Sequence, residues 1–459
     1  MNCDQHHKSK DVIALLKKAG ATECLYVGGY VRDCVLGIAS KDIDIEVYGL
    51  GFDQIVAALA PHFRTDLVGK AFGIIKVDRS IDVSIPRRDN KVGVGHDDFE
   101  VQTDPNMSPH DAAARRDFTV NSLAMNLDCE IIDPFNGEDD LQHGILKATS
   151  GAFVEDPLRV LRGMQFASRF ALKMDKETIE MSRSIKDQCQ HLSKERIFAE
   201  WRKWAGGPFP CNGLDLLLQT EWVENFPELF AMVGCEQEPE WHPEGDVYAH
   251  TSWACYEAVK ICERRGFTPE QREAVMFGVL CHDLGKPTTT ETKYIEKADK
   301  DRIVSHRHAE AGRNLALAFM SSIKAPGPLR KIASRLTAEH MAHVSRRKDK
   351  LTPRMVRRLA YRLHPATIDM WAATCESDAS GRPPMPMYNP VVEWEEMALG
   401  LAVQDSRPKP ILMGRHLFDL GVEPGPEMGE ILTRAFEAQL DGEFLDLDSA
   451  IEWWKESIR

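Results

Sequence analysis

The chain has 459 residues, enough for three or four domains whose cores need no disulfide or metal to hold them together. Hydrophobic residues make up 43% and charged residues 28% of the chain, a balance that excludes collagen-like and mostly disordered proteins. One of the longest apolar runs, residues 274–281, is far shorter than the roughly 20 residues of a membrane-spanning helix, so no membrane association is expected.

The N-terminal segment MNCDQHHKSK has no apolar stretch with a cleavage site, so no secretory signal is expected. The 11 cysteines are an odd number and are scattered from Cys3 to Cys375 without a CxxC pair. This distribution argues against a disulfide framework and against a cysteine zinc site. We therefore expect a cytoplasmic protein in a reducing environment.

Charge is unevenly distributed along the chain. The net charge of -14 argues against a nucleic-acid partner, because phosphate binding depends on Lys and Arg. Residues 301–362, however, contain 15 Lys or Arg against 4 Asp or Glu. This basic block is either a solvated helical face or a site for a polyanion.

The order of elements predicts an α+β protein. A helix around residues 11–19 is followed by the strands LYVGG, KDIDIEVYG, GIIKVD and SIDVSIPR, whereas the chain after residue 153 has almost wholly helical spacing. Segments rich in Gly and Pro at 206–213, 236–246 and 382–390 interrupt the helices. These breaks predict four domains: 1–150, 151–240, 241–350 and 351–459.

Three acidic residues are predicted to share one face of a sheet. Asp42 and Asp44 alternate with Ile43 and Ile45, and Asp82 takes the equivalent polar position in the strand SIDVSIP. Three carboxylates on one face raise one another's pKa unless cations neutralise them, and their oxygens suit Mg²⁺. Alone, such a pattern is more often a solvated strand face.

A glycine pair precedes the first of these acidic strands. Gly28 and Gly29 lie between a predicted strand and helix, where the backbone and the helix N-terminus can hold a phosphate. Arg32, one turn into the helix, would reach the same anion. The alternative is a tight turn with Arg32 on the surface.

Six ordered motifs lie between residues 20 and 205: GGYVRD, KDIDIEVYG, ARRDFTVNSLAMN, DPFNGEDDLQHGILKA, EDPLRVLR and LSKERIFAEWRK. Their order and spacing resemble those of the class II tRNA nucleotidyltransferases, the family of CCA-adding enzymes and bacterial poly(A) polymerases. The resemblance implies that Asp42 and Asp44 bind catalytic Mg²⁺, with Asp82 as the third acid. It also implies a nucleotide-binding group: Gly28, Gly29, Arg32, Arg115, Arg116, Asp117 and Asn121.

The motif EDPLRVLR predicts the start of a helix, with Asp156 as its N-cap and Pro157 at its first position. Asp156 and Arg159 are spaced to share a face. The resemblance implies that these two side chains bond the Watson–Crick edge of the incoming C or A, with Arg162 in support. Alone, the pair is more typical of a surface ion pair with helix capping.

Residues 87–117 form a long, polar, glycine-containing segment, which predicts a mobile loop. In the family, this loop allows the switch to the final A and is shortened in enzymes that add only CC. Its full length here argues against a CC-adding enzyme and leaves CCA addition and A-only addition open.

Histidines are concentrated between His242 and His343, and His282 is followed directly by Asp283. This pattern suits a transition-metal site and resembles an HD-domain phosphohydrolase. The ligands implied by the resemblance are His250, His282, Asp283, His308 and His340. A late aspartate common in such domains has no clear counterpart, so a complete two-metal site stays open, as does the alternative of an inherited helical scaffold for tRNA.

The C-terminal segment resembles a helical tail found in many bacterial members, which implies tRNA binding. The sequence PGPEMGEIL predicts a turn and then a helix that begins at Pro426. The end IEWWKESIR predicts a packing stripe rather than a base-stacking platform.

The resemblance therefore implies a mixed-sheet nucleotidyltransferase head followed by all-α neck, HD and tail domains. The implied activity is addition of C, C and A to the tRNA 3′ end from CTP and ATP, with a secondary HD phosphohydrolase activity. An A-only enzyme and a poly(A) polymerase are alternatives in the same class, although the acidic total leans against the polymerase. Two alternatives come from other functional classes. One is an HD-domain hydrolase whose head only senses nucleotides, and the other is an RNA-binding protein without enzymatic activity.

Overall fold

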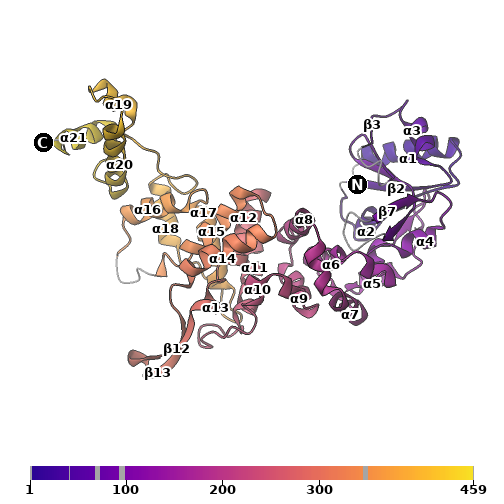
Figure 1. Cartoon of the computed structure of the whole chain (residues 1–459), viewed down its shortest axis with the longest axis horizontal. Helices are drawn as coiled ribbons and strands as arrows, with labels where there is room; N and C mark the ends of the chain where they lie inside the picture. The colour runs from indigo at the N-terminus through magenta and orange to yellow at the C-terminus, as the bar shows by residue number, and fades with distance from the viewer. Residues whose placement is uncertain (1–2, 41, 68–72, 92–98, 345–349, 458–459) are drawn as a thin grey trace. The chain divides into compact units, whose positions relative to one another are not determined.

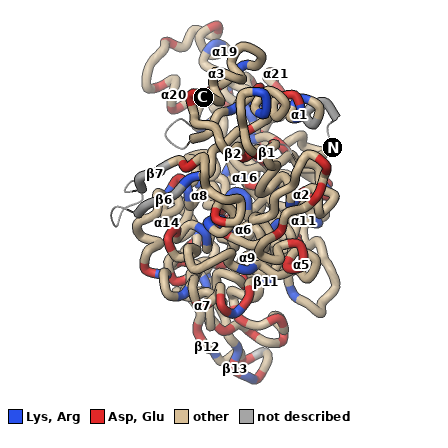
Figure 2. Tube along the Cα trace, turned by 90° about the vertical axis from the view of Figure 1, so that its right-hand side faces the viewer, with Lys and Arg blue, Asp and Glu red and all other residues tan. Residues whose placement is uncertain are grey.

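The chain forms two compact units in a computed structural model, Met1–Asn225 and Phe226–Arg459 (Figure 1). The structure describes residues 3–40, 42–67, 73–91, 99–344 and 350–457. Within these ranges no helix is long and apolar enough to cross a membrane. Lys and Arg are interspersed with Asp and Glu along both units (Figure 2).

The first unit begins with an α/β part and ends with helices. Its helices are α1 (Cys3–Lys18), α2 (Gly29–Val35), α3 (Phe52–Leu59), α4 (Pro109–Ala114), α5 (Gly137–Gln142), α6 (Leu158–Phe170), α7 (Lys176–Ser184), α8 (Lys194–Ala205) and α9 (Pro210–Gln219). Its strands are β1 (Glu23–Val27), β2 (Ile43–Tyr48), β3 (Thr65–Asp66), β4 (Ile74–Val77), β5 (Ile81–Ser84), β6 (Arg87–Lys91), β7 (Phe99–Thr103), β8 (Ala124–Met125), β9 (Ile131–Ile132), β10 (Ile145–Leu146) and β11 (Lys173–Met174).

A seven-stranded mixed sheet organises the head, in the order β3-β4-β5-β2-β1-β8-β9. The pair β2 and β5 is parallel, and the other neighbouring strands are antiparallel. This arrangement confirms the predicted fold class of the head. Because β2 is central and parallel to β5, polar side chains at equal register on the two strands lie side by side.

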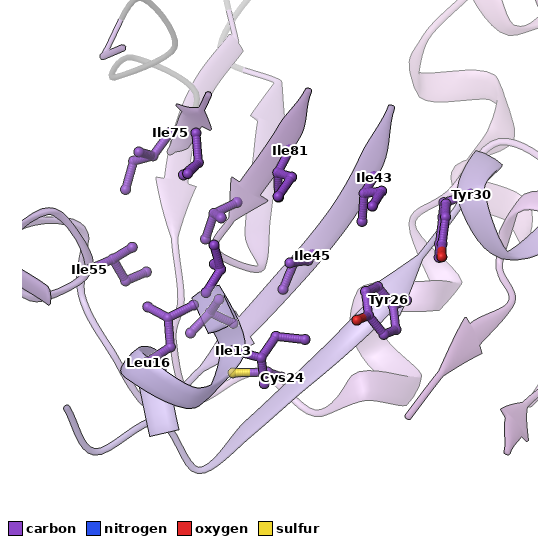
Figure 3. Close-up of a cluster of buried hydrophobic side chains, with 14 of the residues drawn as sticks. Ile13, Leu16, Cys24, Tyr26, Tyr30, Ile43, Ile45, Ile55, Ile75 and Ile81 are labelled. Carbon is purple, nitrogen blue, oxygen red and sulfur yellow. The ribbon is translucent and has the colours of Figure 1, made fainter. Parts of the chain in front are cut away.

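One face of the sheet forms the head's core (Figure 3). Ile43, Ile45 and Ile81 are buried on that face and pack with Ile13 and Leu16 of α1. Since side chains alternate between faces along a strand, burial of these isoleucines turns the intervening acidic residues to the other face.

The segment 87–117 is more regular than the predicted loop. Strands β6 and β7 pair antiparallel, from Arg87 opposite Thr103 to Lys91 opposite Phe99, and α4 follows. Residues 92–98 lie outside the described part. The hairpin satisfies backbone hydrogen bonds that a structureless loop of this length would leave to water, so the prediction of a simple mobile loop was wrong for its two arms.

The second unit is mostly helical. Its helices are α10 (Pro227–Phe230), α11 (Val247–Arg264), α12 (Pro269–Cys281), α13 (Lys286–Thr289), α14 (His308–Ser322), α15 (Gly327–Glu339), α16 (Pro353–Leu363), α17 (Ile368–Ser380), α18 (Val392–Gly400), α19 (Gly414–Asp419), α20 (Pro426–Asp441) and α21 (Leu447–Ser457). A hairpin of β12 (Thr290–Ile295) and β13 (Lys300–Ser305), which the sequence analysis did not foresee, interrupts the helices.

The last three helices share a small core of their own. Leu417, Met428 and Trp454 are buried there, and Trp453 packs against them. Helix α20 begins at Pro426 as predicted. The burial of Trp454 favours the predicted packing stripe over a stacking platform.

Candidate active sites

The carboxylates of β2 and β5 meet on the polar face of the head sheet. Asp44 lies directly opposite Asp82 in the register of the two parallel strands. Both side chains are half-buried, while Asp42, just before β2, is exposed. The structure therefore brings Asp44 and Asp82 together, with Asp42 next to them in the chain.

Burial raises the pKa of Asp44 to about 6, and the nearby carboxylates of Asp82 and Asp42 add to this effect, while Arg116 opposes it. A cation already faces Asp82, since Lys76 Nζ lies 2.7 and 2.9 Å from its two carboxylate oxygens. Sequence analysis missed Lys76, because it lies opposite Asp82 only through the pairing of β4 with β5. The site concentrates negative charge that a divalent cation would neutralise.

Gly28 forms the turn between β1 and α2 with a φ of +66°. A Cβ built at this position would lie 2.7 Å from Nη1 of Arg116. Arg116 donates to Glu46 Oε1 at 3.3 Å and to the carbonyl of Asn121 at 3.4 Å, and Tyr48 donates to the other oxygen of Glu46 at 2.6 Å. The turn needs glycine because of this positive φ, and the Arg116 guanidinium occupies the space where a side chain would begin.

A buried network connects the other predicted nucleotide-binding residues. Arg32 donates from Nη1 to Asn121 Oδ1 at 2.6 Å and binds Asp33 with Nε and Nη2. Asn121 donates to Asp117 Oδ1 at 3.0 Å, and Arg162 donates to Asp117 Oδ2 at 2.7 Å. Arg32 is only 4% exposed, so the alternative of a surface position is wrong.

The predicted template residues flank the start of α6. Pro157 takes the N-cap position and the helix begins at Leu158, so the expected N-cap at Asp156 was wrong by one residue. Asp156 is extended, as a residue before proline prefers. Its Oδ1 nevertheless accepts from the Leu158 amide at 3.1 Å, and its Oδ2 accepts from Arg196 at 3.2 Å.

Arg159 is fixed by two backbone carbonyls. Its Nη1 donates to Ala152 at 2.6 Å and its Nη2 donates to Arg115 at 2.8 Å. Arg115 itself lies 3.9 Å from Glu155. Each terminal nitrogen of a guanidinium carries two N–H groups, so Arg159 keeps donors in addition to these two bonds.

The second unit gathers its histidines and acids around two groups. In the first, His250 Nε2 lies 3.2 Å from Asp378 Oδ1 and 3.8 Å from Asp283 Oδ2. His282 Nε2 lies 3.1 Å from the same Asp283 oxygen and 4.0 Å from Asp378. Asp378 comes from α17, which sequence analysis did not connect with these histidines.

The second group contains His308 and His340 with Asp283. The two Nε2 atoms are 3.1 Å apart, and they lie 3.4 and 3.8 Å from Asp283 Oδ1. Asp283 therefore offers one oxygen to each group. All five predicted HD residues come together, and the arrangement has room for the two-metal site that the sequence left open.

The histidine rings are oriented for ligation. His282, His308 and His340 each donate from Nδ1 to the carbonyl three residues earlier, at 2.7, 2.8 and 2.7 Å. These bonds fix a proton on Nδ1, so in the neutral ring Nε2 is an acceptor that faces the acids. Burial, followed by the neighbouring His308 and His282, lowers the pKa of His340 to about 3, so its imidazole is neutral.

A cation fits this donor set. His282 Nε2 is buried and makes no hydrogen bond to a described residue, and both it and the carboxylate 3.1 Å away offer lone pairs. A metal ion bound by both groups would accept these two lone pairs, which otherwise face each other. Glu244, also missed from the sequence, accepts from Nδ1 of His250 at 2.7 Å and of His242 at 2.8 Å, which orients His250 as carboxylates orient metal-binding histidines.

Comparison with known proteins identifies the family. The chain is 32% identical over 367 residues to the Multifunctional CCA protein of Hahella chejuensis, an alignment that covers 78% of this chain and 82% of that protein. It is equally similar to the Multifunctional CCA protein of Acinetobacter baylyi, with coverages of 78% and 83%. The chain belongs to the CCA-adding tRNA nucleotidyltransferase family.

Three parts of this CCA-adding family member match separate domain families. Residues 24–147 match the poly A polymerase head domain, residues 171–232 match the probable RNA and SrmB-binding site of polymerase A, and residues 247–366 match the HD domain. The predicted family, enzyme class and HD resemblance are confirmed. Asp378 lies beyond the matched HD segment.

Solved CCA-adding enzymes share the fold. The enzyme of Bacillus stearothermophilus in complex with CTP has a TM-score of 0.63 at 20% identity, covering 99% of this chain and 97% of that one. The Thermotoga maritima enzyme complexed with tRNA has a TM-score of 0.58 at 17% identity, with coverages of 98% and 96%. These similarities confirm the predicted fold class.

Replacing Gly28 with alanine is expected to lower kcat/KM for nucleotide addition by about 10- to 100-fold, because the new Cβ displaces Arg116. Gly37→Ala is the control: its φ of +68° is also positive, but nothing lies within 4 Å of a Cβ there. Steady-state kinetics with CTP and ATP compare the two variants. Equal losses in both would show that strain, not Arg116, explains the effect.

Asp117→Ala is expected to destabilise the head by about 1–2 kcal/mol, because it removes the buried carboxylate that pairs with the half-buried Arg162 and accepts from Asn121. Burial alone would raise the pKa of Asp117, but Arg162 and Asn121 outweigh it and hold that pKa below the ordinary 3.8. The stabilisation is therefore fully present above pH 3.8 and lost as pH falls below it. Denaturant unfolding measures the free energy of unfolding of the wild type and of Asp117→Ala, and the difference between them should be smaller at pH 3 than at pH 7. The exposed Asp128→Ala is the control.

Proposed function

We propose that this protein adds C, C and A in turn to the 3′ end of tRNA, taking the nucleotides from CTP and ATP. The observation that carries the proposal is the register that sets Asp44 beside Asp82, inside the segment that matches the poly A polymerase head. The names of the curated relatives favour this activity over A-only addition, poly(A) synthesis and a nucleotide-sensing head. Similar folds solved with CTP, ATP or tRNA support the same choice of substrates.

Asp42, Asp44 and Asp82 would hold the divalent cations that nucleotidyltransferases of this family use. We propose Mg²⁺, because all three donors are carboxylates. Such ions, when bound, would favour ionisation of the attacking 3′-hydroxyl and neutralise charge on the leaving pyrophosphate. The raised pKa of Asp44 and the ion pair between Lys76 and Asp82 support a site that takes up positive charge.

The nucleotide triphosphate would lie beside the Gly28 turn. Arg116, held by Glu46, and Arg32 would bind its phosphate oxygens with backbone amides of Gly28 and Gly29. Asp117 and Asn121, with Arg115, would orient the sugar. The tRNA 3′-oxygen then attacks the α-phosphorus in line, a new P–O bond forms, and pyrophosphate leaves.

Asp156 and Arg159 would select the base. The carboxylate accepts from a base amino group, and the guanidinium donates to ring nitrogen or carbonyl atoms, so both C and A can be bonded while G and U are rejected. Their anchoring by Arg196 and by two carbonyls supports a fixed template surface. Arg162 would support this template from its bond to Asp117.

Extension of three tRNA transcripts, which end before CCA, after C and after CC, tests the proposal. With CTP and ATP together, CCA is expected on the shortest transcript. Addition of a single A only to the CC-ended transcript would mean an A-adding enzyme. Long A tracts on any RNA would mean a poly(A) polymerase, and no extension at all would contradict the proposal.

The histidine cluster supports a second activity, hydrolysis of phosphoesters by a metal centre. We propose that His250, His282, Asp283 and Asp378 hold one ion and that Asp283, His308 and His340 hold another. Their mixed nitrogen and oxygen donors favour transition metals. Hydrolysis of p-nitrophenyl phosphate and its diester by the full chain, loaded with Mn²⁺, Co²⁺ or Ni²⁺, tests this activity; no metal uptake would contradict it.

We propose the same division that the sequence predicts: head 1–150, neck 151–240, HD domain 241–350 and tail 351–459. The matched ranges 24–147 and 171–232 support the head and the neck, and the HD match, 247–366, supports the start of the HD domain but runs past residue 350. A cytoplasmic location follows from the proposed substrate, because tRNA maturation in bacteria takes place there.

A basic cavity between helices of the HD domain and of the tail supports tRNA binding. It has a volume of about 820 Å³ and lies among α14, α15, α16 and α18. Its basic side chains are Arg307, Lys350, Arg354, Arg358 and Arg362. Acids hold several of them in place, as Asp441 holds Arg358 at 2.6 Å and Glu339 holds both arms of Arg362. We propose that tRNA phosphates bind here.

Arg358→Ala is expected to weaken tRNA binding by about 3- to 10-fold and to reduce the slope of log affinity against log salt by about one, since one phosphate contact is lost. Filter binding at several salt concentrations measures both quantities. Arg264→Ala is the matched control, because Arg264 also pairs with a carboxylate but lies on α11, outside the cavity. If the wild type, Arg358→Ala and Arg264→Ala all show the same slope of log affinity against log salt, tRNA does not contact this cavity.

A further inference from the structure

Two polar side chains from outside the matched HD segment reach the histidine cluster. That segment ends at residue 366, whereas α17 and the turn after it carry Asp378 and Arg382. Asp378 Oδ1 lies 3.2 Å from His250 Nε2, and Arg382 Nη2 donates to the same oxygen at 2.8 Å. One carboxylate oxygen is therefore shared between a histidine of the cluster and an arginine.

The backbone holds Arg382 at this place. Gly381 follows α17 directly, and a Cβ added to it would meet the backbone of Ala254 at 2.7 Å. Ala254 lies on α11, one turn beyond His250, so the turn after α17 packs directly against the helix that carries a cluster histidine. Arg382 follows Asp378 by four residues and lies just beyond the end of α17, where its side chain pairs with Asp378 at 2.8 Å.

The guanidinium of Arg382 has an N–H donor that no described residue accepts. Its Nε atom is buried and makes no hydrogen bond to any residue that the structure describes, although a guanidinium carries five N–H donors. Burial would lower the pKa of Arg382, but the carboxylates of Asp378, Asp283 and Glu244 outweigh it and raise that pKa. The side chain is thus a held cation that faces the acids of the cluster.

The charge of Arg382 has a different partner depending on whether a metal ion is bound. While no metal ion is bound, Arg382 offsets the charge of Asp378. A divalent cation held by His250 and Asp378 would neutralise that carboxylate, which would leave the Arg382 guanidinium available to an anion at the same centre. A planar guanidinium fork matches two oxygens of a phosphate group, which a lysine cannot do.

We propose that Arg382 forms an anion subsite of the histidine centre, which binds the phosphoryl group of a phosphoester substrate and the inorganic phosphate product. The subsite rests on the phosphohydrolase function proposed above, and it assigns Arg382 a substrate-binding role that is separate from metal ligation. Asp378 then acts as the ligand, and Arg382 contacts the substrate.

The test measures inorganic phosphate binding to the full chain loaded with Mn²⁺, by calorimetry, together with the bound metal per chain. Arg382→Gln is expected to weaken phosphate binding at least tenfold while the metal content stays unchanged, and Arg382→Lys is expected to restore part of the affinity. Arg264→Gln serves as control, since Arg264 pairs with Glu376 on the same helix α17.

Unchanged phosphate affinity in Arg382→Gln would overturn the proposal. Loss of metal in that variant would also overturn it, because Arg382 would then only support Asp378. Hydrolysis assays separate the two proposals. If Arg382→Gln hydrolyses phosphoesters as fast as the wild type, the anion subsite is wrong but the phosphohydrolase activity stands. If phosphate binding depends on Arg382 but the wild type hydrolyses no phosphoester, the phosphohydrolase activity is wrong but the anion subsite stands.

Discussion

Asp44→Asn is expected to lower nucleotide addition by about 1000-fold or more, because it removes a metal-binding oxygen at the point where β2 and β5 meet. The change keeps the size of the side chain and relieves repulsion from Asp82, so the head should be at least as stable as the wild type. Single-turnover extension of a CC-ended tRNA transcript with ATP measures the loss. A protein that kept activity within tenfold would exclude Asp44 as a metal ligand.

Two controls accompany this variant. Asp53→Asn removes an exposed carboxylate in the first turn of α3 and is expected to leave extension unchanged. Metal uptake by the histidine cluster should also be unaffected in Asp44→Asn, because that cluster belongs to the other compact unit. Loss of both properties together would indicate unfolding instead of a defect in catalysis.

Asp378→Ala is expected to reduce metal binding at the histidine cluster, and phosphoester hydrolysis with it, by about 100-fold or more, because even partners that only orient metal ligands contribute 10- to 100-fold. His250 would lose the carboxylate that lies 3.2 Å from its Nε2. Metal titration of the purified chain, followed by hydrolysis of p-nitrophenyl phosphate, measures both losses.

Asp369→Ala on the same helix is the matched control, because Asp369 stands in the first turn of α17, away from the cluster end. It is expected to bind metal and hydrolyse as the wild type does. tRNA extension should stay intact in both variants. Wild-type metal affinity in Asp378→Ala would leave the late aspartate without a role in ligation.

Local alternation was enough to predict the acidic face of the head. Ile43 and Ile45 must be buried, so the residues between them turn outward, and this reasoning needs no knowledge of the fold. That Asp44 lies opposite Asp82 depends instead on which strands become neighbours. The same holds for Lys76, which reaches Asp82 only because β4 and β5 pair.

Long-range packing explains what the sequence could not reveal in the second unit. Asp378 stands 128 positions after His250, and nothing near it in the chain resembles a metal motif. Its role appears only when α17 packs against α11. The hairpin β12–β13 was missed because its strands are exposed and polar, so they carry no apolar run of the kind that marks a buried strand.

Each acidic centre carries its own resident cation: Lys76 for Asp82, Lys286 at 2.6 Å for Asp283, and Arg382 for Asp378. The carboxylates are therefore not left to repel one another while the chain folds. Both units can therefore fold without bound metal ions. A chelator is expected to abolish their activities without unfolding them. Bound ions would then add to the stability of a fold that already forms without them.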